Sequence, residues 1–460
     1  MKLTIKNVLQ AKACSFIAVG VALVTMAASQ VGAEQVTVFD EIVSGVPAAN
    51  PEEITDNIFS PEFTPGLVAQ GIELLENPSG VITQYGILSD GNNTEPDQNT
   101  YLILDHNPGG PTPGYDYGRH FLFQGHENSS DVAYVTRINL DVASPDHRIT
   151  LLTPVDAGSL THFNSIDGSA WDPFSSTLLF TQEASTKGGV IEMGADFDAN
   201  TGGGAGLRTL YGSLGQGGYE GVHPDNSGNI WIVEDVGGTL VLNDAKNPNS
   251  FVYRFVPLNP SDLSRGKLQA LQVSINGNPI VFVPVDDQHP TGDTRSRSQL
   301  LLHTVGASWP VQWVTVHDTE INGTDPFDAN ALAKAAGATP FKRPENGQFQ
   351  PGSNFRTFFF VVTGDTDNVA GTDPVLAARG AWGGIFRVDL RADRNSGLIS
   401  LVVLGDADHA SFDNITFVDD SDTVLVTEDR GDTLHDQLNT LDSIWAYKLY
   451  KQRPNQNIVS

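Results

Sequence analysis

The chain has 460 residues, a formal net charge of −29 and a single cysteine. Such an acidic protein lacks the basic surface that binds nucleic acid or anionic lipid. Because the cysteine is Cys14, close to the N-terminus, the rest of the chain has no disulfide, thiolate metal ligand or cysteine nucleophile. The 46 glycines and 26 prolines favour many short strands and turns over long helices.

The first 33 residues have the features of a secretory signal peptide. Three lysines precede an apolar run at residues 15–28, and small residues at 31–33 fit a cleavage site. Lysines in place of twin arginines indicate the Sec route. We therefore expect a periplasmic or secreted protein. No later apolar run is long enough for a transmembrane helix, so we expect no membrane contact after cleavage. We also expect a monomer.

Four regions are predicted along the chain. The signal peptide (1–33) is followed by an irregular N-terminal lead-in (34–97), in which Pro, Asn and Asp occur without clear periodicity. From residue 98 to 450, short apolar strands alternate with turn signals, which indicates an all-β domain. Within it, alanine-rich residues 328–336 predict a short helical insertion that ends at Gly337. Residues 451–460 form a C-terminal tail.

One local pattern recurs in the β region: an apolar strand ends in an acidic residue and is followed by a turn and a second strand. The acids that end its five copies are Glu127, Glu183, Asp235 (after Glu234), Asp365 and Glu428 (before Asp429). The step from the third copy to the fourth is roughly double the others, which leaves room for a degenerate copy near residues 313–318. Repeats of this size with several strands each predict a β-propeller, here with six blades.

Carboxylates at repeated positions can serve a metal. Calcium needs several oxygen ligands, and a propeller can direct one acid from each blade toward its axis. Glu220, Glu345 and Asp413 add to the repeat acids, because each lies at the start or end of a predicted strand. Taken singly, each of these acids is more often a turn residue or a solvated surface charge than a metal ligand. The candidate metal ligands are therefore Glu127, Glu183, Glu220, Asp235, Glu345, Asp413 and Glu428.

Several of these segments resemble the PhoX-type alkaline phosphatases in order and spacing. The matching pieces lie within residues 115–450: 125–127, 171–183, 218–222, 343–345, Asp365, 412–414 and 428–429. The resemblance implies a six-bladed propeller that holds calcium and iron in its channel and hydrolyses phosphomonoesters. It implies that Glu220, Glu345 and Asp413 are metal ligands, with Glu183 as a further one. It also implies that Arg343 contacts the substrate phosphate.

The chain departs from that family at the cysteine that ligates iron, because the corresponding stretch, residues 164–168, has none. The iron site thus lacks a ligand, and we expect a calcium-dominated centre. The function expected is an extracytoplasmic, metal-dependent phosphatase acting on a small phosphoester. Two alternatives stay open: a calcium-binding propeller that serves as a scaffold without catalysis, and another propeller hydrolase such as a lactonase or a phytase-like enzyme.

Overall fold

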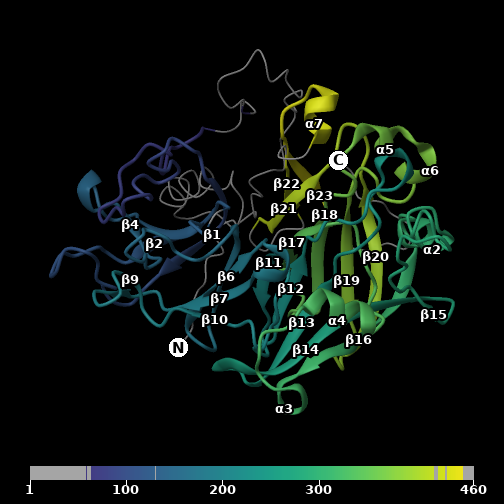
Figure 1. The fold of residues 1–460 in the computed structure, drawn as a ribbon, viewed down its shortest axis with the longest axis horizontal. Helices are drawn as coiled ribbons and strands as arrows, with labels where there is room; N and C mark the ends of the chain where they lie inside the picture. The colour runs from purple at the N-terminus through teal and green to yellow at the C-terminus, as the bar shows by residue number, and fades with distance from the viewer. Residues whose placement is uncertain (1–58, 60–63, 130, 419–422, 430–432, 449–460) are drawn as a thin grey trace, which may run out of the picture.

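A computed structural model describes residues 59, 64–129, 131–418, 423–429 and 433–448 (Figure 1). These residues form mostly β-strands with a few short helices, as expected. None of the helices in these ranges has the length and apolar character needed to cross a membrane. The predicted signal peptide (1–33) and C-terminal tail (451–460) lie outside the described residues.

The first half of the domain contains two four-stranded antiparallel sheets. The first sheet is β1-β2-β3-β4: β1 (Glu95–Ile103), β2 (His120–Glu127), β3 (Tyr134–Asn139) and β4 (Ile149–Leu151). The second has the order β10-β7-β6-β5: β5 (Ile166–Asp172), β6 (Thr177–Gln182), β7 (Gly189–Met193) and β10 (Arg208–Thr209). A small ribbon joins β8 (Phe197–Asp198) to β9 (Gly203–Gly204).

The second half contains a ten-stranded sheet and a three-stranded sheet. The large sheet has the order β11-β12-β13-β14-β16-β20-β19-β18-β17, with β15 paired to β14. Its strands are β11 (Tyr219–Pro224), β12 (Ile230–Glu234), β13 (Val252–Asn259), β14 (Asp262–Ile275), β15 (Asn278–Pro279), β16 (Ser308–Asp318), β17 (Pro344–Phe349), β18 (Thr357–Val362), β19 (Gly384–Leu390) and β20 (Ser396–Leu404). The last sheet is β21 (Phe412–Phe417), β22 (Thr423–Glu428) and β23 (Ile444–Lys448).

The helices are short and lie in the connections between strands. They are α2 (Arg297–Leu302), α3 (Thr319–Asn322), α4 (Ala329–Ala335), α5 (Asn368–Thr372), α6 (Pro374–Ala377) and α7 (Thr433–Leu438), with 3₁₀ turns η1 (Pro145–His147), η2 (Ser185–Lys187) and η3 (Leu242–Asp244). Helix α4 confirms the predicted insertion. Asp328 caps its N-terminus by accepting a hydrogen bond from the Ala331 amide, and Gly337 follows it at a φ of 74°.

Neighbouring sheets pack face to face, so many of their strands are buried on both sides. Strand β18 shows this clearly, because all six of its residues are buried. Phe358 and Phe360 belong to the apolar cluster that contains Trp231, whereas Phe359 and Val361 belong to the cluster formed with β21 and β22. A strand buried between two layers reads as a continuous apolar run, which is how residues 358–362 read in the sequence.

The four main sheets contain five units of consecutive antiparallel strands, because the ten-stranded sheet holds two of them. The first strands of these units are β1, β5, β11, β17 and β21, and they follow one another in space around the middle of the molecule. Six blades are not confirmed. The sixth copy expected near residues 313–318 lies in β16, which pairs with β14 on one side and β20 on the other and is therefore not the first strand of a unit. The long step in the sequence reflects the extended β14, the additional strand β16 and the helices α2 to α4.

The irregular lead-in is described from residue 64. It contains isolated bridges, such as Leu74 with Gln84 and Ile82 with Leu88, in place of regular strands. Its apolar side chains, including Ile82 and Tyr85, pack on the first sheet beside Tyr134 and Ile149. Strand β1 begins at Glu95, within the segment assigned to the lead-in.

Candidate metal centre

The same β-bulge occurs in all five first strands at the end that faces the middle of the molecule. In each pair, three steps along the first strand oppose two steps along the second, as between Tyr219–Val222 and Ile232–Glu234. A bulge interrupts the regular alternation of side chains between the two faces of the sheet, so the side chain of its extra residue can point in a different direction from its neighbours. The first residue in each bulge is an acid: Asp97, Asp167, Glu220, Glu345 and Asp413.

The second strand of each unit supplies another position beside the bulge. In β11, for example, the residue before the bulge is Tyr219, which pairs with Glu234 of β12. The position meant is the residue after that partner, here Asp235. Four of the five are acids and the fourth unit has a threonine: Glu127, Glu183, Asp235, Thr363 and Asp429. The Thr363 hydroxyl donates a hydrogen bond to the Glu345 carboxylate. The fold therefore presents two side chains from each unit to one place.

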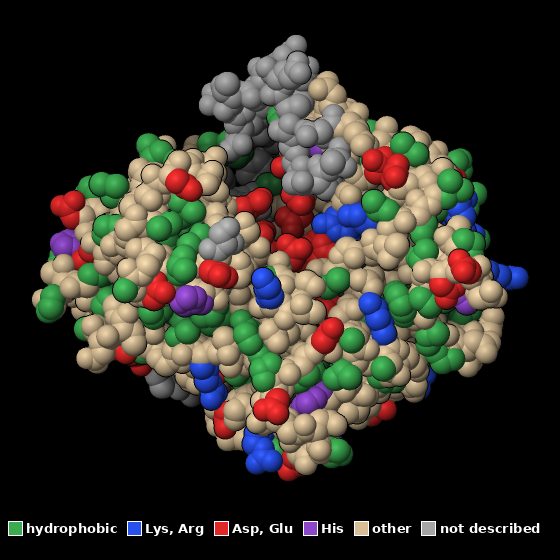
Figure 2. Space-filling view, in the orientation of Figure 1, with side chains coloured by type: hydrophobic (Ala, Val, Ile, Leu, Met, Phe, Trp, Pro, Cys, Tyr) green, Lys and Arg blue, Asp and Glu red, His purple; other side chains and the backbone are tan. Residues whose placement is uncertain are grey.

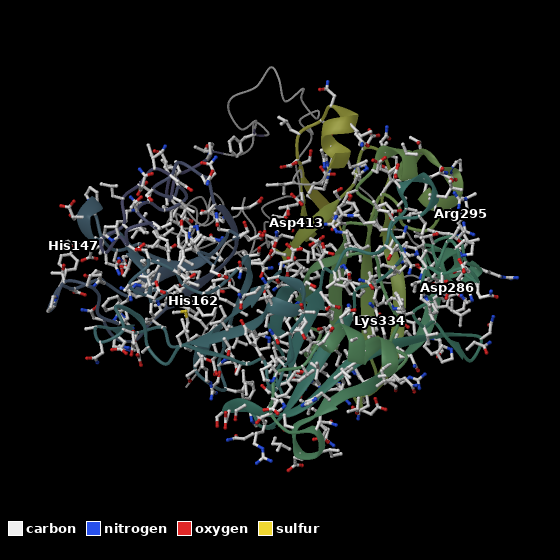
Figure 3. All side chains as sticks on the ribbon, viewed as in Figure 1. His147, His162, Asp286, Arg295, Lys334 and Asp413 are labelled. Carbon is white, nitrogen blue, oxygen red and sulfur yellow. The ribbon has the colours of Figure 1, made fainter. Side chains whose placement is uncertain are left out.

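These positions surround a central cavity of about 420 Å³. Figure 2 shows a hollow in this face where Asp and Glu side chains gather, and Figure 3 places Asp413 near the middle of the molecule. The cavity is lined by ten acids, two basic residues and one threonine: Glu95, Asp97, Glu127, Asp167, Glu183, Glu220, Asp235, Glu345, Asp413, Asp429, Lys246, Arg343 and Thr366.

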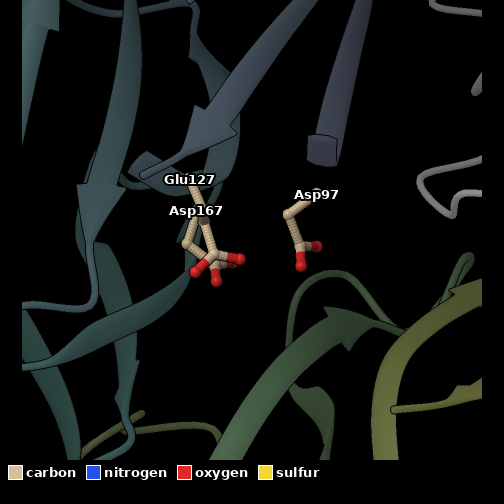
Figure 4. Close-up of side chains that lie close together, drawn as sticks. All are labelled: Asp97, Glu127 and Asp167. Carbon is tan, nitrogen blue, oxygen red and sulfur yellow. The ribbon is translucent and has the colours of Figure 1, made fainter. Parts of the chain in front are cut away.

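Two groups of three carboxylates are close enough to share an ion. Oxygens of Asp97, Glu127 and Asp167 lie within 4.8 Å of one another, and their carboxylates face one another in Figure 4. Oxygens of Glu183, Glu220 and Asp235 lie equally close. An all-oxygen donor set at this spacing suits a hard cation such as calcium. The residues present therefore fit a calcium ion better than a metal that requires sulfur ligands.

Burial and mutual repulsion disfavour the ionised state of these acids. Burial, followed by the charges of neighbouring carboxylates, raises the pKa of Asp167, Glu220 and Glu345 well above the usual range. Burial and then the charge of Asp235 raise the pKa of Glu183 to about 8. A cation bound here would offset both effects, because it replaces lost hydration and neutralises like charges.

Arg343 is held against the acids on one side of the cavity. Its Nε donates a hydrogen bond of 2.7 Å to Asp235 Oδ2, and its Nη2 lies 3.6 Å from Glu345 Oε1. These two carboxylates outweigh the effect of burial and raise the pKa of the arginine above its already high value. Its Nη1 has no hydrogen-bond partner among the described residues. The guanidinium therefore keeps one donor for a ligand.

A layer of side-chain amides supports the bulges. Asn414 follows Asp413, and its Nδ2 donates hydrogen bonds to Asp413 Oδ2 at 2.8 Å and to Asp97 Oδ1 at 3.0 Å. Its Oδ1 accepts a hydrogen bond from Asn346 Nδ2 at 2.7 Å. Asn346 and Asn414 are the second bulge residues of β17 and β21. Their bonds connect three units and hold carboxylates of β1 and β21 beside each other.

The structure brings together most of the predicted site residues. Arg343 and six of the seven candidate ligands, all except Glu428, line the cavity. Glu428 points into a separate pocket, where it accepts hydrogen bonds from the backbone amides of Ala410 and Ser443 and lies 3.4 Å from His435. Its neighbour Asp429 lines the central cavity in its place.

Sequence reasoning missed four acids of the cavity as candidates: Glu95, Asp97, Asp167 and Asp429. A signal for Asp167 exists, because Ile166-Asp167-Gly168 repeats the apolar-acid-glycine order of residues 219–221. It lies in the stretch 164–168 that lacks the cysteine expected from the family resemblance. An oxygen ligand is thus present in that stretch.

Comparisons with known proteins bear on the second half of the chain most directly. The family model described as alkaline phosphatase PhoX matches residues 229–450, which confirms the resemblance expected from the sequence. Asp235, Arg343, Glu345 and Asp413 lie inside the match. No curated protein matches the chain.

Among solved structures, a luciferin-regenerating enzyme is similar at 10% identity with a TM-score of 0.24. The match covers 67% of this chain and 63% of the other, so this chain spans less than two thirds of that structure's length. A likeness this weak carries no argument about fold or function.

Proposed function

We propose that this protein is a metal-dependent phosphatase that hydrolyses phosphomonoesters outside the cytoplasm, with a calcium-dominated centre in its central cavity. We further propose that the five sheet units are blades of a propeller-type fold. The observation that supports the function best is the combination in one cavity of two carboxylate triads and Arg343, whose Nη1 has no partner in the described part of the chain. The PhoX family match over residues 229–450 favours the same reading.

The two triads would hold the cations, with Glu345 and Asp413 beside them. Bound calcium would polarise a phosphoryl oxygen and offset negative charge in the transition state. The carboxylates would fix where such ions lie, because each belongs to a bulge or lies beside one and several are buried. Asn414 keeps the carboxylates of Asp97 and Asp413 oriented toward each other.

Arg343 would bind the phosphoryl group directly. Its Nη1 can donate to one phosphoryl oxygen while Nε stays bonded to Asp235. The backbone at Arg343 is in the left-handed region at a φ of 55°, and its carbonyl accepts a hydrogen bond of 2.9 Å from the Thr363 amide. A donor fixed in this way needs little reorganisation during the reaction, which is the condition for effective charge stabilisation.

Hydrolysis of p-nitrophenyl phosphate by two variants, with and without calcium, tests the proposal. Arg343→Ala should keep calcium binding and lose turnover by about 10²-fold, the usual effect of removing one charge-stabilising donor. Glu345→Ala should lose both turnover and part of the calcium affinity. Arg387→Ala is the matched control. Arg387 does not line the cavity, and its Nε lies 2.9 Å from Asp389 Oδ2, so this variant should behave as wild type.

Wild-type protein that binds calcium yet turns over no phosphomonoester, phosphodiester or lactone would overturn the phosphatase proposal and favour the calcium-bound scaffold. Turnover of a lactone alone would identify a different hydrolase. If Arg343→Ala and Arg387→Ala have equal activity, Arg343 has no role in the reaction.

A further inference from the structure

Asp235 belongs to two sets of interactions at once. Its Oδ2 accepts the 2.7 Å hydrogen bond from Arg343 Nε, and one of its carboxylate oxygens lies within the triad formed with Glu183 and Glu220. The side chain is only 3% exposed, and its Oδ1 is buried and has no hydrogen-bond partner among the described residues. A buried carboxylate oxygen without a partner is costly, which indicates that a ligand completes it.

We propose that Asp235 is a positioning residue shared by Arg343 and a divalent cation, so that cation binding makes the arginine available to an oxyanion. This inference rests on the proposed function, because it takes the triad as a cation site and Arg343 as the oxyanion donor. It adds that the two ligands bind interdependently through one carboxylate.

The charges around the guanidinium give the reason. Without a cation, the guanidinium of Arg343 is already paired with the carboxylate of Asp235 and also lies beside that of Glu345. An oxyanion that approaches Nη1 meets their repulsion as well as the attraction of the arginine. In a buried site such charges are poorly screened. A divalent cation held by Glu183, Glu220 and Asp235 would offset two negative charges and reduce that repulsion.

The path of the coupling is short and rigid. Arg343 precedes β17 directly, and its backbone is fixed by the bond from Thr363 and by its left-handed conformation. Asp235 follows β12 directly, and its amide donates a hydrogen bond of 2.7 Å to the Gly218 carbonyl. Because both backbones are anchored, the effect passes through charge and one hydrogen bond and requires no loop movement. By linkage, the oxyanion must also strengthen cation binding by the same factor.

Isothermal titration calorimetry with inorganic phosphate, on calcium-free and calcium-loaded protein, measures the coupling without any turnover. A metal that simply contacts phosphate would also give calcium-dependent binding, so the wild type alone does not decide. The informative variant is Asp235→Asn, which removes the negative charge beside Arg343. It should bind phosphate in the absence of calcium at least about tenfold more tightly than wild type does.

Two further variants test whether the gain in phosphate affinity depends on the pair formed by Asp235 and Arg343. Glu127→Gln removes one negative charge from the same cavity but at the other triad, and it should give a clearly smaller gain. Arg343→Ala combined with Asp235→Asn should abolish the gain, because the arginine is the donor that the substitution releases. Thermal melting of each variant reports whether it is folded.

Equal gains in Asp235→Asn and Glu127→Gln, or a gain that persists without Arg343, would overturn the proposal. No change in calcium-free phosphate affinity for folded Asp235→Asn would also overturn it. These outcomes are separate from failure of the proposed function. A protein that shows the coupling but hydrolyses no phosphomonoester keeps this inference and loses the phosphatase assignment, and active protein without the coupling does the reverse.

Discussion

Removal of calcium should lower the melting temperature by an amount that the two carboxylate triads allow us to estimate. A ligand that binds only the folded state at a hundredfold excess over its Kd stabilises that state by about 2.7 kcal/mol. Two such sites contribute about 5 kcal/mol. A chain of 460 residues unfolds with an entropy of about 1 kcal/mol/K, so the expected shift is about 5 °C.

Differential scanning calorimetry with a calcium chelator, and then with excess calcium, measures this shift. Magnesium at the same concentration is the control, because it keeps its water ligands and prefers a regular octahedral site over a crowded carboxylate cavity. A melting curve that stays within about 1 °C across chelator, magnesium and calcium would refute the reasoning, since about 1 °C corresponds to much less than one occupied site.

Three further results are expected. Because burial, followed by the charge of Asp235, raises the pKa of Glu183 to about 8, calcium binding near pH 6.5 should release protons, and the affinity should rise with pH until about 8; calorimetry in buffers of different ionisation enthalpy would show no proton release if this is wrong. Asp429→Asn should weaken calcium binding, whereas Glu428→Gln should change it little, and the reverse order would contradict the placement of these acids. Gly168→Ala should destabilise the fold and weaken calcium binding, because its Cβ would lie 2.2 Å from a backbone carbonyl of β11; Gly66→Ala, which meets nothing within 4 Å, is the control, and equal melting temperatures would contradict the close approach.

The candidate site was largely predictable where an acid interrupts an apolar context. Glu220 and Asp413 lie between aromatic and small or amide residues at the start of strands, where a surface acid would more often have polar neighbours. The family resemblance added Arg343, whose role no local pattern indicates. Its position depends on a left-handed backbone and on the register of β17 against β18, which are properties of the folded sheet.

The differences between the predicted and the observed positions have three separate causes. Glu428 and Asp429 are adjacent acids at the end of β22, and successive side chains of a strand point to opposite sides. Which of the two reaches the cavity depends on pairing with β21, which short-range patterns do not give. Asp97 was placed in the lead-in because β1 has few apolar residues at its start. The sixth repeat was assigned by spacing, although β16 lies between β14 and β20 and begins no unit of its own.

The repeated bulge separates the choice of ligand from the stability of the sheets. In each unit the acid is the extra residue of the bulge, so regular pairing resumes on both sides of it whichever side chain it has. Ligand length, charge and number can therefore change one unit at a time while the strand register stays the same. The five positions already differ in side-chain length, because three are aspartates and two are glutamates. With the proposed metal centre, single substitutions at the five bulges would adapt the cavity to cations of different size.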